Sequence, residues 1–230
     1  AVTASLMLNR SAEAVLVCGI DAKALPTTGF PVNLKAGEPQ EMVLDGLAPD
    51  TRYFYELRDA GTGVRLLPAS GPGTFHTARP AGGSFTFTVT ADSHLDEHTE
   101  PAVYLRTLGN ALAAGPDFHV DLGDTSMTEK HKDRESATRQ YLAQRYYFGT
   151  LAHSAPLFLV LGNHDGEFVR GRNDASLAVW ACGMRKRYFP NPVPDTFFSG
   201  NTVRHSEAGL LQDYYAWEWG DALFVVLDAY

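Results

Sequence analysis

The sequence has few basic residues. Its 230 residues include 19 Lys and Arg against 27 Asp and Glu, which gives a formal net charge of -8 at pH 7. Proteins that bind nucleic acids group their Lys and Arg side chains against the phosphate backbone, and here the basic residues are scattered. The composition therefore excludes an extended nucleic-acid-binding surface.

Long apolar runs are also missing. A membrane-spanning helix needs roughly 20 consecutive apolar residues, whereas the apolar segments here are short, as at residues 156–161 and 222–227. We therefore predict no membrane span. There is no internal repeat or low-complexity segment, and with 44% hydrophobic residues the chain is long enough for two modest folded domains.

Cysteine is scarce, with Cys18 and Cys182 as the two thiols. They lie far apart in the sequence, and a disulfide would require a close approach of their Cα atoms that spacing alone does not indicate. We expect two buried free thiols, and the cysteine count does not identify the cellular compartment.

The first part of the chain has the pattern of an all-β domain. Short segments rich in alternating apolar residues are separated by Gly, Pro, Asp and Asn, which are typical of turns. The predicted strands cover residues 3–8, 14–18, 40–47, 52–57 and 73–77. We expect them to form a small antiparallel sandwich over residues 1–79.

Residues 47–55, LAPDTRYFY, resemble the corner of fibronectin type III domains, and residues 73–77, GTFHT, resemble the closing strand of that domain. In that corner a Tyr hydroxyl bonds to backbone a few residues upstream. The resemblance implies a structural role for Tyr53, and His76 is also expected to be structural. A carbohydrate- or protein-binding role for this domain stays open as an alternative.

The second domain is predicted to cover residues 80–230 and to be α/β in character. A linker, ARPAGG, stands at residues 78–83, because Pro and paired Gly interrupt both helical and strand periodicity. Beyond it, strands alternate with helices. The predicted strands are residues 85–90, 118–122 and 156–161 with a hairpin at 214–219 and 222–228, and the helices start near residue 101 and cover about 132–147.

Three short polar motifs each follow one of these strands. Residues 91–94 read A-D-S-H, residues 123–124 read G-D, and residues 162–165 read G-N-H-D. Open α/β sheets collect their ligands at the carboxyl ends of the strands. Carboxylate, imidazole and amide groups in one place are suitable ligands for a pair of divalent ions, which also need one carboxylate to bridge them.

The ordered set D-x-H, G-D and G-N-H-D resembles the calcineurin-like metallophosphoesterase superfamily. The resemblance implies two-metal hydrolysis of a phosphate ester by a metal-bound hydroxide, with a small phosphorylated substrate. Asp92 and His94 would bind the first ion, Asp124 would bridge both, and Asn163 would bind the second. Two divalent ions are expected, and manganese, zinc and iron all suit such ligands.

The same resemblance implies that His164 contacts the phosphoryl group and assists the leaving oxygen, with Asn163 also on the substrate side. Asp165 would orient the His164 imidazole, since a carboxylate at one ring nitrogen fixes the tautomer at the other. These are the predicted catalytic residues. His119, inside a buried strand, is predicted to be a satisfied core residue, whereas His98 and His131 are predicted to be solvated and His205 is not expected to be a ligand.

The sequence departs from the family pattern in two places. Two later His-bearing motifs do not occur before Tyr230, so we expect a C-terminal remainder of the same polypeptide to carry further His ligands, with Phe224 and Val226 exposed in its absence. A β-domain ahead of the phosphoesterase also resembles the layout of purple acid phosphatases, but Met127 stands where their ferric-binding Tyr would be. From this layout we predict a secreted or periplasmic protein.

Three functions therefore compete. A phosphatase is the leading interpretation, and a phosphodiesterase that acts on nucleotides or lipid head groups is the alternative among enzymes. The alternative of another class is a non-catalytic binding or adhesion protein with a relic phosphoesterase domain.

Overall fold

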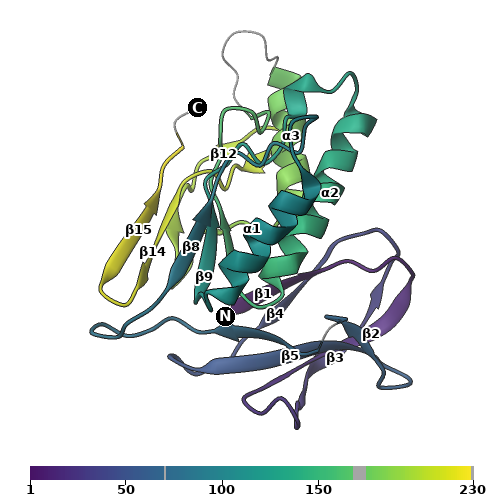
Figure 1. Ribbon diagram of the computed structural model, residues 1–230, viewed down its shortest axis with the longest axis vertical. Coiled ribbons are helices and arrows are strands. Elements are labelled where there is room, and N and C mark those ends of the chain that lie inside the picture. Colours follow the sequence, from purple (N-terminus) through teal and green to yellow (C-terminus); the bar gives the residue numbers. More distant parts are fainter. Residues whose placement is uncertain (70, 168–174, 229–230) are drawn as a thin grey trace. The chain divides into compact units, whose positions relative to one another are not determined.

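The protein folds as two compact units. The structure is a computed structural model, and it describes residues 1–69, 71–167 and 175–228 (Figure 1). The first unit comprises Ala1–Pro80 together with His153–Ala155, and the second comprises Ala81–Ala152 and Pro156–Tyr230.

The first unit is all-β. Its larger sheet has the strand order β3-β2-β5-β6, β7 also pairs with β5, and β1 pairs with β4 in a separate antiparallel sheet. The strands are β1 (Val2–Leu6), β2 (Ala12–Gly19), β3 (Thr27–Leu34), β4 (Gln40–Leu44), β5 (Arg52–Asp59), β6 (Arg65–Leu67) and β7 (Gly73–His76). All five predicted strands are present, and β3 and β6 are additional to the prediction.

Side chains from both sheets share one apolar core in this unit. Leu6 and Leu44 from the smaller sheet are buried with Leu16, Leu57 and Phe75 from the larger one. The N–H of Ala48 donates to the Tyr53 hydroxyl at 2.9 Å, which is the upstream backbone contact expected of the corner. The structural role predicted for Tyr53 agrees with this contact, and the likeness to a fibronectin type III sandwich stays a prediction.

The second unit is built around a parallel sheet with the strand order β10-β9-β8. Helices follow these strands along the chain, as the alternating pattern predicts. The bounds are β8 (Phe87–Thr90), α1 (Pro101–Ala113), β9 (Phe118–Asp121), η1 (Thr128–Lys130), α2 (Arg134–Ala152), β10 (Leu157–Leu159), α3 (Ala175–Tyr188), β11 (Ser199–Gly200), β12 (Arg204–His205), β13 (Gly209–Leu210), β14 (Tyr215–Trp219) and β15 (Ala222–Val226).

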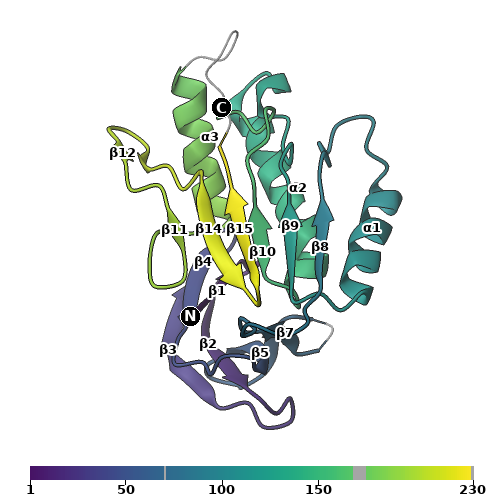
Figure 2. The ribbon, with the colours of Figure 1, turned by 90° about the vertical axis from the view of Figure 1, so that its left-hand side faces the viewer.

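Within this unit the parallel sheet lies between helices and a hairpin. Figures 1 and 2 show α1 and α2 on one side of β8 and β9, with the hairpin of β14 and β15 on the other. The Phe118 ring of β9 contacts the rings of Trp219 and Phe224, with centroids 5.0 and 5.2 Å apart, and Phe158 stacks on Trp217 at 4.2 Å. These aromatic contacts hold the hairpin on the sheet.

The prediction that Phe224 and Val226 would be exposed is wrong. Val226 is buried, and the half-buried Phe224 stacks on Trp217 at 4.9 Å. The register of the hairpin explains this, because Trp217 pairs with Phe224 and cross-strand partners share a face. Leu223 and Val225 lie on the opposite face and are 64% and 56% exposed.

Two expectations from composition can be compared with the structure. Cys18 and Cys182 are both free and buried, as predicted. Among the described residues, no helix is both long enough and apolar enough to cross a membrane.

A buried charge cluster in the first unit allows a test of pH-dependent stability. The Glu56 side chain is 7% exposed and accepts bonds from Arg58 and Arg65 at 2.8 and 3.0 Å. Burial raises the pKa of Glu56, but the bonds and charges of the two arginines outweigh it, so that its pKa lies below the ordinary value of 4.5. The ionised form therefore stabilises the fold above pH 4.5, and this contribution is lost as the pH falls through the lowered pKa.

We predict that Glu56→Gln lowers the free energy of unfolding by about 1–3 kcal/mol at neutral pH, because both arginines lose a charged partner. Thermal unfolding followed by circular dichroism at pH about 7 and about 3 measures the effect. The difference from wild type should shrink at the acidic pH. Glu41→Gln, at an exposed position of β4, is the control and should be neutral; an equal loss in both variants would contradict the prediction.

Candidate metal centre

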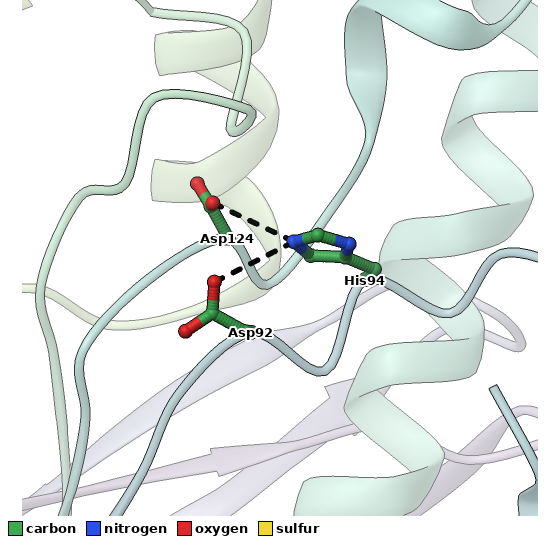
Figure 3. A group of neighbouring side chains, drawn as sticks. All are labelled: Asp92, His94 and Asp124. Carbon is green, nitrogen blue, oxygen red and sulfur yellow. Dashed lines mark ion pairs between the residues drawn. The ribbon is translucent and has the colours of Figure 1, made fainter. Parts of the chain in front are cut away.

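The three predicted polar motifs meet at one edge of the parallel sheet. Asp92 and His94 follow β8, and Asp124 follows β9. Donor atoms of these three side chains all lie within 4.8 Å of one another. Figure 3 shows the two carboxylates on either side of one nitrogen of the His94 ring. The structure thus brings together three of the four predicted metal ligands.

The His94 ring is suited to bind a cation. Its Nε2 lies 3.7 Å from Asp92 Oδ1 and 3.5 Å from Asp124 Oδ2. This nitrogen is buried and has no hydrogen-bond partner among the described residues. Donor atoms that share an ion at roughly 2.0–2.2 Å lie about 3–4 Å apart. The two oxygens and one nitrogen therefore fit a divalent ion in number, chemistry and spacing.

The backbone at the site adopts a strained conformation. Asp92, His94 and Asp124 have φ angles of 57°, 50° and 51°, in the left-handed region that residues with a Cβ seldom adopt. Two backbone bonds join the turns, from Asp92 N–H to Gly123 O and from His94 N–H to Asp124 O, both at 3.0 Å. Strain of this kind persists only where surrounding contacts impose it, and it is common at functional sites.

Two glycines allow the turns after β9 and β10 to approach each other. A Cβ on Gly162 would lie 2.9 Å from the Asp124 Cγ and closer still to its Oδ1. A Cβ on Gly123, whose φ is 96°, would lie 2.8 Å from the Gly162 Cα. Gly162 is needed because its backbone passes directly beside Asp124, and Gly123 is needed because the backbone of Gly162 passes directly beside it.

The second oxygen of Asp124 contacts the G-N-H-D turn. Asp124 Oδ1 accepts the His164 N–H at 2.9 Å, and the His164 ring centroid lies 5.5 Å from that of His94. Asp124 therefore stands between the two sides of the site, as a bridging ligand must. The Asn163 side chain is exposed in the same turn, and its role as a ligand stays a prediction.

The structure differs from the prediction that Asp165 orients His164. The buried Asp165 carboxylate instead accepts four backbone N–H groups, from Asp124, Thr125, Ser126 and Gly162, at 2.8–3.0 Å. Burial raises its pKa to about 7, and the nearby Asp121 and Asp124 charges add to this, against the effect of the N–H donors. Asp165 is thus a structural residue that fastens two turns together.

Glu129 takes the position beside His164 that the sequence analysis assigns to Asp165. Its carboxylate contacts His164 Nδ1, and both side chains are partly exposed. Sequence reasoning missed Glu129 because it belongs to a connecting segment, around η1, without helical or strand periodicity. Its proximity to His164 depends on how that segment folds back over the G-N-H-D turn.

A buried polar chain lies beneath the metal turns. The Thr90 hydroxyl donates its one proton to Asp121 at 2.8 Å, so it must accept a hydrogen bond from His119 Nε2 at 2.9 Å. In a neutral imidazole the other nitrogen carries no proton, and Nδ1 therefore accepts from the Thr88 hydroxyl at 2.8 Å. Burial lowers the pKa of His119 to about 4. Burial also raises the pKa of Asp121 to about 6, against bonds from Thr125 and Thr90. His119 is a satisfied core residue, as predicted.

The remaining histidines lie outside the cluster of donor atoms. His98 is exposed, as predicted, and the His205 Nδ1 accepts the N–H groups of Glu207 and Ala208. His131 differs from the prediction, since it is half-buried and its Nε2 lies 2.9 Å from Gln140 Oε1.

We predict that Gly162→Ala lowers the affinity for divalent ions about tenfold or more. The added methyl would displace the Asp124 carboxylate, and overpacking typically costs about 1–3 kcal/mol. Titration of the metal-free protein with Mn²⁺ measures the affinity. Gly149→Ala in α2 is the control, because a Cβ there meets nothing within 4 Å. Unchanged Mn²⁺ affinity in Gly162→Ala would show that Asp124 does not bind the ion.

One of two comparisons with known proteins found a match, and that match includes the residues of this site. No curated protein matches the chain. Residues 85–219, more than half of the chain, match the family described as calcineurin-like phosphoesterase, and this span contains the three turns and all of the donor groups above. The chain therefore belongs to the calcineurin-like phosphoesterase family.

Proposed function

We propose that this protein is a metal-dependent phosphatase that hydrolyses small phosphate monoesters with a pair of divalent ions. The observation that carries the proposal is the convergence of Asp92, His94 and Asp124 within 4.8 Å, together with the contact of Asp124 with the His164 turn. Asp92 and His94 would hold one ion, Asp124 would bridge, and Asn163 would contribute to the second.

The charge of the site supports metal dependence. Asp92 and Asp124 lie at the centre of the site, and Asp121 and Asp165 lie beneath it, close enough for their charges to affect one another. Such a group of carboxylates repels a phosphate anion and attracts cations. Bound divalent ions would supply Lewis-acid chemistry, activating water and neutralising phosphoryl charge. Removal of the ions should therefore abolish substrate binding as well as turnover.

His164 is the proposed acid of the reaction. Because Glu129 contacts Nδ1, the ring can present Nε2 to the leaving oxygen of the ester. Glu129 would fix the tautomer and the direction of the ring, as a carboxylate behind a functional imidazole commonly does. The Asp165 carboxylate would keep the backbone of the His164 turn in place beside Asp124.

The competing functions give different results in two assays. A phosphodiesterase would hydrolyse bis-nitrophenyl phosphate faster than nitrophenyl phosphate, whereas the proposed phosphatase prefers the monoester. A relic domain in a binding protein would hydrolyse neither and would bind less than about one divalent ion per chain. The prediction that later His-bearing segments complete the ligand set of the second ion stays a prediction.

We predict that His164→Ala lowers kcat for nitrophenyl phosphate by about 100-fold or more, with little loss of bound metal. Asp124→Ala should lose metal and activity together, because its carboxylate is central to the cluster. Elemental analysis of the purified variants measures the metal. His98→Ala removes an exposed imidazole and is the control. Full turnover in His164→Ala would rule out the proposed role of His164.

We predict that Glu129→Gln lowers kcat about 10- to 100-fold while KM and metal content change little, because the amide no longer fixes the His164 tautomer. Steady-state kinetics with nitrophenyl phosphate separate kcat from KM. Glu97→Gln, at an exposed position, is the matched control. A wild-type kcat in Glu129→Gln would mean that the contact with His164 has no role in turnover.

A further inference from the structure

The turn that carries Asp92 and His94 does not hold its shape by itself. Asp92, His94 and Leu95 all have left-handed φ angles, of 57°, 50° and 52°. Left-handed backbone is unfavourable for residues that carry a Cβ, because the Cβ approaches the following carbonyl oxygen. Contacts from outside the turn must therefore keep both side chains directed at the same point.

Gln140 provides such a contact from α2. It is 6% exposed, and its Nε2 donates to the carbonyl oxygens of His94 and Leu95, the second at 3.4 Å. These two carbonyls belong to two of the three strained residues. The side chains of Thr99 and Gln144 also reach the turn, but they bond to Ser93 instead.

The other end of the Gln140 amide contacts a second segment of the site. Its Oε1 accepts the Met127 N–H at 2.9 Å, and since a backbone N–H can only donate, this contact fixes which end of the amide is oxygen. His131 Nε2 must then donate to the same oxygen. Met127 lies between Asp124 and Glu129, so one buried amide joins the His94 turn to the segment that carries the His164 partner.

We propose that Gln140 is a positioning residue for the metal centre. Its amide holds the His94 turn in the left-handed conformation that directs the imidazole at Asp92 and Asp124, and it fixes the distance from this turn to the Met127 segment. The inference rests on the proposed metal site. Groups that orient ligands from behind commonly change metal affinity about 10- to 100-fold when they are removed.

The test compares two substitutions at Gln140 with one elsewhere. Gln140→Leu removes both ends of the contact at similar volume. Gln140→Glu keeps an acceptor for Met127 but places a carboxylate oxygen against the carbonyls of His94 and Leu95. Asn201→Leu is the matched control, because Asn201 is also a buried amide at 6% exposure and bonds to Asp213, outside the site.

Two measurements on the metal-free chain separate positioning from stability. Titration with Mn²⁺ gives the Kd, and the absorption bands of added Co²⁺ report the ligand geometry. We expect both Gln140 variants to raise the Mn²⁺ Kd about tenfold or more and to alter the Co²⁺ bands. Asn201→Leu should lower the unfolding temperature while its Kd stays within about twofold of wild type.

Either of two results would overturn this role. One is a wild-type Kd and Co²⁺ spectrum in a folded Gln140 variant, and the nearly isosteric Gln140→Glu guards against a failure of Gln140→Leu to fold. The other is an equal loss of affinity in Asn201→Leu, which would assign the effect to general stability. A wild-type protein that binds neither ion would overturn the proposed function itself.

Discussion

The geometry of the site depends on one buried carboxylate. Asp165 accepts N–H groups from the turn after β9 and from Gly162 after β10, so that two loops from different strands share one anchor. Burying a charge is costly unless hydrogen bonds compensate for it, and here four N–H donors offset part of that cost. The last residue of the G-N-H-D motif is thus needed even though its side chain does not point at the reaction. Its role is to bring Asp124 and His164 to one place.

The predicted metal ligands lie on backbone whose conformation is unfavourable for residues with a Cβ. Three non-glycine residues with left-handed φ angles, Asp92, His94 and Asp124, carry the donor groups, and Gly123 and Gly162 permit the close approach of two turns. Because the strain is opposed by contacts from Asp165 and other buried groups, the donors are already in position before an ion arrives. Little ordering then remains to oppose metal binding.

Much of the site could be predicted because its information is local. Motifs of two to four residues at strand ends identified three residues that the structure brings together. Glu129 and Gln140 could not be found in this way, since their contacts depend on how residues 125–140 fold back. The strand β3 (Thr27–Leu34) was missed because Gly29 and Pro31 break its alternation. Alternation located the hairpin strands, but it could not tell which face of β15 would be covered.

The histidine beneath the site has a consequence for strand alignment. Apolar side chains on β8 and β9 could pack almost equally well after a slip of two residues, since such a slip returns each side chain to its own face. The bonds between His119 and the hydroxyls of Thr88 and Thr90 would be lost if His119 moved toward the turn, because the ring would then face Thr90 and Asp92 instead. These bonds therefore resist a slip in that direction, and register decides how far each strand extends before its turn. A buried residue outside the site thus helps to align the ends of the two strands that precede Asp92 and Asp124.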